Sequence, residues 1–170
     1  NAMERLDDMY IKDSLTGAYN RFGMERFFVD IRRKCLMSGG YLQMSFVDVD
    51  GLKDINDTYG HEEGDRIINA VASLLKNESG KYYVIRFGGD EFVVMGVAAS
   101  EEEVKAYWKR VEAAVERYNG EKSHRARMSF SIGYDLIRPD AGTCLEDCIR
   151  VADKKMYAEK NRKKAMGGTK

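Results

Sequence analysis

Apolar side chains recur along this chain with two different periods. Between residues 21 and 37 they follow the roughly 3.6-residue period of an amphipathic helix, and Gly39 and Gly40 come just after it. Residues 41–49 form a dense apolar run rich in strand-forming side chains, with Gly51 beyond it. The two patterns predict a helix followed by a buried central strand.

Beyond the central strand the helical and strand-like patterns alternate again. A short polar segment comes first, and residues 67–75 then show the apolar face of a second helix. Two strand-like runs, 82–87 and 92–97, flank the pair Gly88-Gly89. Because glycine reaches the positive φ angles that tight hairpin turns require, these runs predict a β-hairpin.

The last third of the chain holds three more predicted elements. Val104 to Tyr118 have the spacing of an amphipathic helix, and Ser100 with the acidic cluster at 101–103 suits its N-terminus. Residues 127–134 alternate as a strand does, and residues 145–160 have the pattern of a final helix. The whole order predicts the α+β class, with one central antiparallel sheet flanked by helices.

Length and composition favour one domain. The chain has 170 residues, one proline and no low-complexity tract. Residues 1–12 are interpreted as a tag remnant, Asn1-Ala2, followed by the end of an upstream linker helix. We therefore expect the domain itself to span residues 13–165, followed by a C-terminal tail at residues 166–170.

The charges of the chain balance, with 28 Lys and Arg against 28 Asp and Glu. A net charge of zero gives no reason to expect a nucleic-acid polymer or an anionic membrane as a partner. Residues 1–100, however, carry 12 basic and 16 acidic side chains, whereas residues 101–170 carry 16 and 12. The neutral total therefore hides a separation of charge that the function should explain.

Cysteine and apolar content indicate the compartment. Cys35, Cys144 and Cys148 are too few, and odd in number, for a disulfide framework, so a reducing, cytoplasmic environment is expected. We interpret Cys144 and Cys148 as helix-packing residues rather than metal ligands. No apolar run approaches the ~20 residues that span a bilayer, so no membrane contact by this domain is expected. A membrane anchor elsewhere in the parent protein stays open.

Carboxylates gather where the central strand ends. Asp48-Val49-Asp50 closes that strand, and Asp90-Glu91 follows the glycine pair of the hairpin. If the hairpin pairs beside the central strand, Asp48 and Asp90 converge, and carboxylate oxygens are ligands that suit Mg²⁺. Each carboxylate taken alone is more often a solvated turn residue. Two acidic sites beside glycine-rich turns favour a metal site, where the glycines let a phosphate or ribose approach the backbone.

The polar segment at 53–65 carries groups that suit a purine base. Asn56 and Asp65 can together bind a guanine edge, because a carboxylate accepts hydrogen bonds from N1 and N2 of guanine. Capping a helix is the other role open to Asp65, and a lone His61 is more often structural than a general base.

Basic residues crowd the final predicted helix and its end. They are Lys154, Lys155, Lys160, Arg162, Lys163 and Lys164. Most of them are expected to form a solvated face that also suits the helix C-terminal dipole. One or two of them can instead reach phosphates.

Taken together, these segments resemble the GGDEF-domain diguanylate cyclase family. Residues 86–92, Arg-Phe-Gly-Gly-Asp-Glu-Phe, contain the GGDEF signature, and residues 13–21 are similar to the family's opening D-x-L-T-G-x-x-N-R turn. Residues 46–65 resemble its D-x-D to G-D block, residues 129–133 its late S-x-G strand, and residues 152–160 its final helix. Several linked motifs in the right order are far more specific than one, and they cover nearly the whole chain.

The resemblance implies a fold and a reaction. The fold is a palm-like, ferredoxin-like sheet related to those of nucleotidyl cyclase catalytic domains. The reaction condenses two GTP into cyclic di-GMP with release of pyrophosphate, in a homodimer whose subunits each hold one GTP. An upstream sensory or dimerisation domain in the parent chain is implied as well.

The family motifs also imply roles, position by position. The ligands of Mg²⁺ (or Mn²⁺) would be Asp48, the Val49 carbonyl, Asp90 and Glu91. The catalytic residues would be Asp90, Glu91 and Lys53, with Asp90 nearest the transferred proton. The GTP-binding residues would be Asn56 and Asp65 at guanine, with Gly88, Gly89, Lys160 and Lys164 at the phosphates.

Two departures from the family pattern stand out. Many members carry an inhibitory product site, R-x-x-D, ahead of the signature, whereas residues 79–82 here are Ser-Gly-Lys-Tyr. We therefore expect no inhibitory product site in this chain. Near the end, Lys163-Lys164-Ala165 replaces Gly-Arg-Asn, and Lys164 would bind phosphate with less geometric specificity than arginine.

Two other functions compete with an active cyclase. One is a catalytically silent module that binds GTP or cyclic di-GMP and regulates a partner. Degenerate relatives of that kind usually lose signature acids or glycines, and this sequence has lost none. The other is a structural dimerisation domain, which would leave Lys53, Asn56 and Asp65 unexplained.

Overall fold

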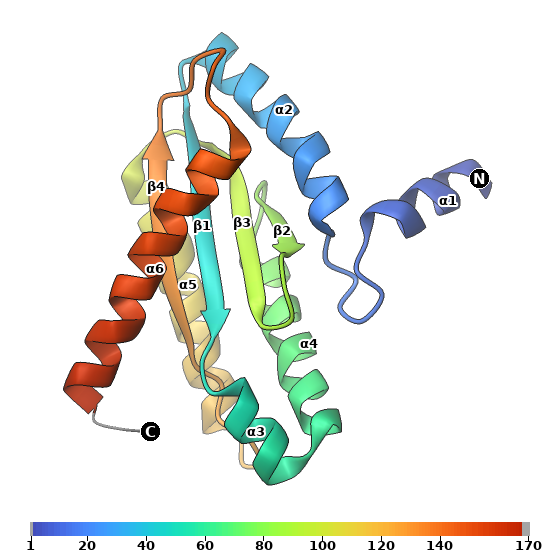
Figure 1. The fold of residues 1–170 in the computed structure, drawn as a ribbon, viewed down its shortest axis with the longest axis vertical. Helices are drawn as coiled ribbons and strands as arrows, with labels where there is room; N and C mark the ends of the chain where they lie inside the picture. The colour runs from blue at the N-terminus through green and yellow to red at the C-terminus, as the bar shows by residue number, and fades with distance from the viewer. Residues whose placement is uncertain (1, 168–170) are drawn as a thin grey trace.

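The structure of the chain, a computed structural model, describes residues 2–167. Asn1 of the expected tag remnant and residues 168–170 of the expected tail lie outside the described residues. Within residues 2–167 the elements are α1 (Ala2–Ile11), α2 (Arg21–Ser38), β1 (Tyr41–Val49), α3 (Leu52–Tyr59), α4 (His61–Glu78), β2 (Tyr83–Arg86), β3 (Glu91–Ala98), α5 (Glu101–Gly120), β4 (Phe130–Ile137) and α6 (Leu145–Gly167). In Figure 1 the strands stand between the helices, and α1 extends away from the other elements.

The strands form one antiparallel sheet, which confirms the predicted fold class. Across residues 2–167 it has four strands in the order β2-β3-β1-β4, so the predicted central strand β1 is paired on both sides. The register places Asp48 opposite Glu91 of β3 and opposite Ser131 of β4. The β2–β3 hairpin therefore lies beside the central strand, the condition under which the two acidic sites converge.

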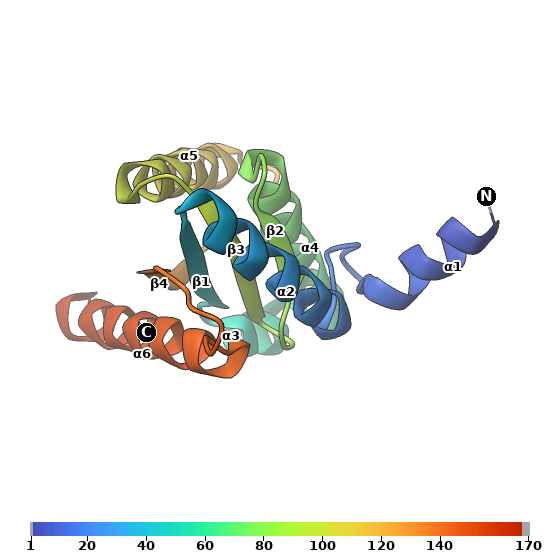
Figure 2. The same ribbon diagram turned by 90° about the horizontal axis from the view of Figure 1, so that it is seen from above.

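Helices cover both faces of the sheet. In Figure 2, α5 and α6 lie on opposite faces of it. Six of the nine residues of β1 are apolar, because its side chains alternate between two cores. Phe46 belongs to the core with α2 and α6, whereas Val47 and Val49 belong to the core with α4 and α5. With both faces covered, polar side chains gather at the ends of the strands.

The ends of two helices follow the expected local signals. Asn20 caps α2 by accepting a hydrogen bond from the Gly23 N–H at 2.9 Å. Gly39 ends this helix in the left-handed conformation, with φ 74°. Ser100 caps α5 by accepting from the Glu103 N–H at 3.3 Å, as the sequence predicts.

Two segments differ from the sequence prediction. The polar segment after β1 contains α3, a helix in which no residue is fully buried and only Leu52 and Ile55 pack against the core. So few apolar positions give too weak a period to predict a helix. The last strand begins at Phe130 rather than at residue 127, because the chain reaches β1 only there.

The hairpin is present, but its turn differs from the predicted one. Among the described glycines, those with positive φ include neither Gly88 nor Gly89. The connection is four residues long, and the N–H groups of Phe87 and Gly88 both donate to the Glu91 carbonyl, at 2.8 and 3.2 Å. Gly88 instead leaves room for a neighbouring side chain, because a Cβ there would displace the Glu91 carboxylate from its present position.

The final helix and the cysteines complete the fold. Helix α6 continues through Gly167, so residues 166 and 167 of the expected tail are helical. Cys148 is buried on α6, and burial raises the pKa of its thiol to about 11, which fits a packing role. None of the helices in residues 2–167 combines the length and the apolar content needed to cross a membrane.

Candidate nucleotide and metal site

The acidic residues of the two motifs meet at one edge of the sheet. The Val49 N–H donates to the Asp90 carbonyl at 2.8 Å, and Asp48 lies opposite Glu91. Because the N–H and C=O of a residue in an antiparallel strand point the same way, the Val49 carbonyl faces the Asp90 side. One backbone carbonyl and three carboxylates therefore share this edge, which we call the acidic edge.

The carboxylates of the acidic edge are short of compensating charge. The Asp48 side chain is 14% exposed, and its Oδ1 atom is buried without a hydrogen-bond partner among the described residues. Burial raises the pKa of Asp48, and the neighbouring Asp90 raises it further. Burial, Asp90 and Asp48 likewise raise the pKa of Glu91. A cation placed here would offset the cost of burying these negative charges and would reduce the repulsion between them.

The acidic edge fits a hard divalent cation. Asp48, Glu91 and the Val49 carbonyl offer oxygen ligands, and Asp48 Oδ1 lacks any other partner. No ready-made group of three or more acidic, His or Cys side chains able to hold a metal occurs in residues 2–167. Mg²⁺ does not need one, because it is usually held by one or two carboxylates together with phosphate oxygens and waters.

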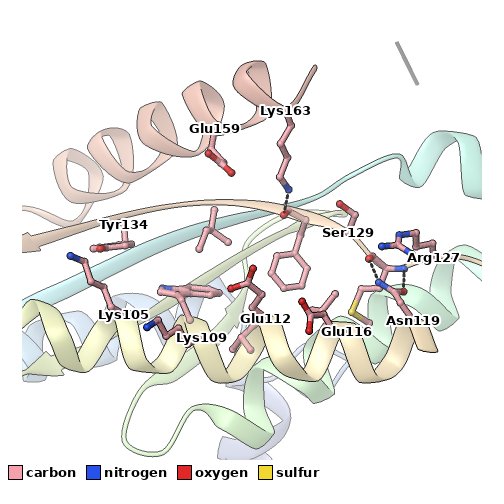
Figure 3. Close-up of a pocket in the computed structure, with 16 residues that line it drawn as sticks. Lys105, Lys109, Glu112, Glu116, Asn119, Arg127, Ser129, Tyr134, Glu159 and Lys163 are labelled. Atoms are coloured by element: carbon pink, nitrogen blue, oxygen red, sulfur yellow. Dashed lines mark hydrogen bonds between the residues drawn. The ribbon is translucent and has the colours of Figure 1, made fainter. Parts of the chain in front are cut away.

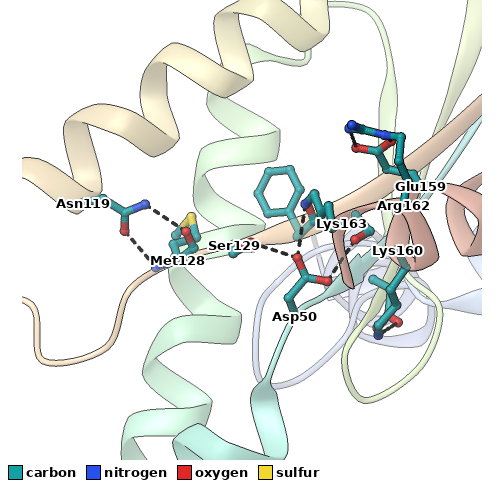
Figure 4. Close-up of polar contacts among 11 residues, drawn as sticks. Asp50, Asn119, Met128, Ser129, Glu159, Lys160, Arg162 and Lys163 are labelled. Carbon is teal, nitrogen blue, oxygen red and sulfur yellow. Dashed lines mark hydrogen bonds and ion pairs between the residues drawn. The ribbon is translucent and has the colours of Figure 1, made fainter. Parts of the chain in front are cut away.

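Two lysines of α6 reach carboxylates at the end of β1. Lys160 Nζ lies 2.5 Å from Asp48 Oδ2, and Lys163 Nζ lies 3.2 Å from Asp50 Oδ2. Burial lowers the pKa of Lys160, but Asp48 and its acidic neighbours outweigh burial and raise it overall. Lys164, the other predicted phosphate ligand on α6, is exposed. The basic part of the chain thus contacts the acidic part directly, as Figure 4 shows for Asp50 and Lys163.

Two arginines hold the loop between β2 and β3. Arg86 Nη2 donates to the Gly89 carbonyl at 2.9 Å, and its Nη1 lies 3.3 Å from Asp13. Arg21 donates to the Phe87 carbonyl at 2.7 Å, and its guanidinium lies 3.8 Å from the centre of the Phe87 ring. In the sequence these residues are only the ends of motifs. The contacts of Arg21 with Phe87 and of Arg86 with Asp13 each join residues more than 60 positions apart, so the sequence does not reveal them.

The predicted guanine ligands lie on two consecutive helices. Asn56 belongs to α3, and its amide lies so close to Gly64 of α4 that a Cβ there would overlap it. Asp65 follows Gly64, is exposed, and lies in the fifth position of α4, so it does not cap this helix. Lys53 is exposed in the first turn of α3, and His61 is exposed at the start of α4, not held as a structural histidine. Since α3 begins three residues after Val49, these helices adjoin the acidic edge.

Cavity volume does not identify the candidate site. A cleft of about 510 Å³ runs between α5 and α6 along β4, and it shares none of the predicted site residues (Figure 3). A second cavity, of about 380 Å³, includes Glu91 together with Arg21, Phe87 and Asp153. The chemistry of the acidic edge locates the site, because its carboxylates repel one another and Asp48 keeps an unpartnered oxygen.

The motifs and the geometry agree with a comparison to known families. The family model described as "Diguanylate cyclase, GGDEF domain" matches residues 10–166. The chain belongs to this family. The description of this family couples the GGDEF domain with the name diguanylate cyclase.

A curated protein and several solved structures are similar to the chain. Diguanylate cyclase DosC of Escherichia coli (strain K12) is 34% identical over 158 residues, which are 88% of this chain and 33% of DosC. The chain thus spans about a third of that relative's length.

Two solved structures share the fold of this chain. The GGDEF domain of YfiN (TpbB) from Pseudomonas aeruginosa is 28% identical, with a TM-score of 0.77 over 89% of both chains. The coiled coil and GGDEF domain of DgcB from Caulobacter crescentus, crystallised with cyclic di-GMP, covers 95% of this chain. It has a TM-score of 0.83, is 21% identical, and 86% of it is matched.

Proposed function

We propose that this chain is the catalytic domain of an active diguanylate cyclase, a nucleotidyltransferase of second-messenger signalling. It would condense two GTP into cyclic di-GMP and release two pyrophosphates. The observation that carries the proposal is the convergence of Asp48, Asp90 and Glu91 at the acidic edge, with Lys160 beside them. Family membership supplies the reaction, and an intact signature argues against a catalytically silent module.

Each candidate residue would have a separate task in this reaction. Asn56 and Asp65 would orient the guanine base, whereas the loop of Gly88 and Gly89 would let the phosphates approach the backbone. Lys53, Lys160 and Lys164 would bind the phosphates as cations. Asp90 would lie nearest the 3′-hydroxyl proton, which must leave as the new P–O bond forms.

The acidic edge would hold the divalent cation, Mg²⁺ or Mn²⁺. Its ligands would be Asp48, Glu91, the Val49 carbonyl and, at its outer side, Asp90. When bound, the cation would supply charge neutralisation for the triphosphate and the leaving pyrophosphate.

Catalysis would require a homodimer. Each 3′-hydroxyl must attack the α-phosphate of the other GTP, and one chain holds a single set of the candidate residues. Two domains would therefore face each other across their acidic edges. An upstream sensory or dimerisation domain in the parent chain would control this encounter.

We further propose that the domain works in the cytoplasm. GTP is available there, and the free thiols of Cys35, Cys144 and Cys148 suit a reducing compartment. The parent protein would be either soluble or anchored in a membrane outside this domain.

A product assay tests the proposed function. The chain is incubated at high concentration with GTP and Mg²⁺, and the products are separated by chromatography. We expect cyclic di-GMP and pyrophosphate, and a loss of at least about 100-fold in rate with Asp90→Ala, because a group that handles the proton is removed. Glu102→Ala on α5, an exposed carboxylate far from the site, is the matched control. GTP binding without any cyclic di-GMP would favour the silent module instead.

A further inference from the structure

Asp50 directly follows β1, two residues after Asp48, but its surroundings differ from those of Asp48. Ser131 Oγ donates to Asp50 Oδ1 at 2.9 Å, and Ser129 Oγ donates to Asp50 Oδ2 at 2.8 Å. Lys163 Nζ also lies 3.2 Å from Oδ2. Both oxygens of Asp50 are therefore satisfied by this chain, whereas Asp48 keeps an unpartnered oxygen. The Asp50 carboxylate therefore bonds to side chains of this chain and has no free oxygen for a metal.

Asp50, Ser129, Ser131 and Lys163 form what we call the Asp50 cluster (Figure 4). It joins the end of β1, the start of β4 and the last turns of α6. The backbone takes part as well, because the Asp50 N–H donates to the Ser129 carbonyl at 2.9 Å. Three elements that are far apart in the sequence are thus tied together two residues from Asp48.

Lys163 makes a second contact that an ordinary surface ion pair lacks. Its Nζ donates to the Phe130 carbonyl at 2.6 Å, visible in Figure 3. The hydrogen bond from the Asp50 N–H to the Ser129 carbonyl shows that the backbone N–H and C=O of Ser129 point toward β1. Because successive residues of a strand alternate in this respect, the N–H and C=O of Phe130 point away from β1. Lys163 therefore satisfies a carbonyl that β1 cannot reach, and it holds α6 against β4 at this point.

The position of Lys163 also determines the position of Lys160. Residues three apart in a helix lie on the same side, so the two ammonium groups reach the end of β1 together. Lys160 contacts Asp48, and Lys163 contacts Asp50. A shift of α6 at Lys163 would move Lys160 relative to the acidic edge.

This arrangement is a property of this chain's own sequence. Where the family motif has Gly-Arg-Asn, the chain has Lys163-Lys164-Ala165, and α6 continues without interruption to Gly167. A glycine at position 163 would offer neither the ammonium nor the contact with the Phe130 carbonyl.

We propose that Asp50 and Lys163 are positioning residues for the triphosphate end of the nucleotide. The Asp50 cluster holds the Val49 backbone and Lys160 at the spacing that the triphosphate and its cation require. Asp50 and Lys163 themselves touch neither. This inference rests on the proposed function, since it assumes that the acidic edge receives the triphosphate of GTP.

Binding measurements test the positioning role without requiring turnover. The full 170-residue chain is titrated calorimetrically with a GTP analogue that cannot be cyclised, in Mg²⁺, and separately with guanosine. Lys163→Met should weaken binding of the triphosphate analogue about tenfold, the usual cost of losing a residue that supports a metal site. Guanosine binding should stay unchanged, because α3 and α4 are untouched.

Three further variants separate positioning from direct contact. Lys163→Arg should restore most of the affinity, since a guanidinium can serve both Asp50 and the Phe130 carbonyl. Asp50→Asn should weaken binding like Lys163→Met, and the double variant should be no weaker than either single one. Lys154→Met changes an exposed lysine of the same helix and should have no effect.

Several results would overturn the inference. They are equal losses for the triphosphate analogue and guanosine, tighter binding after Asp50→Asn, or full affinity after Lys163→Met. If Lys163→Met fails to fold, Ser131→Ala removes a single hydroxyl and should weaken only triphosphate binding. A chain that binds the analogue with these losses but makes no cyclic di-GMP would refute the cyclase proposal alone. A wild-type chain that binds no analogue would refute both.

Discussion

Gly64 shows how a residue without a side chain can belong to a recognition site. It lies in α4 directly under the Asn56 amide, and a Cβ at this position would overlap that amide. Gly64→Ala should therefore displace Asn56 and weaken GTP-analogue binding about tenfold or more, the loss of one well-placed polar contact. Calorimetric titration measures the affinity, and urea unfolding checks that the fold is kept.

The control for this prediction is Gly120→Ala, at the end of α5. A Cβ at Gly120 meets no atom within 4 Å, so neither binding nor folding should suffer. Alanine also favours a helix over glycine, which should offset part of the strain that Gly64→Ala introduces in α4. Unchanged binding by Gly64→Ala would show that Asn56 takes no part in guanine recognition.

Asp13 should make the stability of the chain depend on pH. Burial raises the pKa of Asp13, but hydrogen bonds from Thr16 and the charge of Arg86 outweigh burial and hold the pKa below its ordinary value of 3.8. A carboxyl with a lowered folded-state pKa contributes stability above its unfolded pKa and loses it as the pH falls. Asp13→Asn should therefore be less stable than wild type near pH 7, with the difference shrinking below about pH 4.

Urea unfolding from neutral to acidic pH measures this difference. The free energy of unfolding of both proteins is compared at each pH, so that other titrating groups cancel. Asp8→Asn, which makes the same change at an exposed carboxyl on α1, serves as the control for the substitution itself. A gap between wild type and Asp13→Asn that stays constant or widens in acid would contradict the assignment.

At the level of elements, the contact of α6 with β4 depends on Gly133. A Cβ there would overlap backbone atoms of Ala152, Lys155 and Met156, none of which can turn away as a side chain can. Gly133→Ala should lower the free energy of unfolding by about 2 kcal/mol or more, the usual cost of overpacking a closed contact. Gly142→Ala, where the nearest atom lies at 3.4 Å, should change it by less than about 0.5 kcal/mol. Equal unfolding midpoints in urea for both variants would refute this view.

Elements with a strong apolar period could be predicted from the sequence, and those without one could not. The β1 strand matches its predicted run because both faces are buried, so six of its nine positions are apolar. Helix α3 is missed because its sequence, Leu-Lys-Asp-Ile-Asn-Asp-Thr-Tyr, has few apolar positions and no buried residue. The Gly88-Gly89 turn is predicted with the wrong conformation. Two glycines in a row indicate a turn, but they do not show whether the backbone needs a positive φ or a neighbouring group needs the room that a side chain would fill.

For the candidate site, the sequence predicts which residues meet but not all of their partners. The expected convergence of Asp48 and Asp90 depends on the hairpin pairing with β1, and the structure confirms that pairing. The arginine contacts that hold the hairpin loop, and the serines around Asp50, depend on distances that no sequence period encodes. The roles assigned to Lys53, Asp65 and Lys164, all exposed, stay predictions.

Across the whole molecule, the separation of charge between the two parts of the chain has a structural explanation. Two of the basic residues of α6, Lys160 and Lys163, pair with Asp48 and Asp50 of the acidic part. Others compensate acids nearby, as Lys155 does for Asp135 at 3.0 Å. Part of the separation is therefore neutralised inside the fold, so a bound triphosphate would have to compete for Lys160.

The whole domain should also lack feedback inhibition through the family's product site. Residues 79–82 offer no arginine, and their side chains have other tasks: Ser79 donates to the Lys76 carbonyl, Lys81 pairs with Glu103 and Tyr82 is buried. Initial rates at increasing cyclic di-GMP should show at most competition with GTP. Potent noncompetitive inhibition of the purified chain would mean that another surface binds the product.

The long final helix has a mechanical consequence. Its 23 residues span about 35 Å, and Gly133 meets it near Ala152 and Met156, closer to its middle than to either end. If α6 were held at that contact alone, it could rotate about it, and a displacement of its N-terminal end at Leu145 would move Lys160 in the opposite direction. Lys155, Lys160 and Lys163 hold the helix at three further points, where they contact Asp135, Asp48 and Asp50. These contacts oppose such a rotation, so a displacement at Leu145 would reach the acidic edge only by straining them.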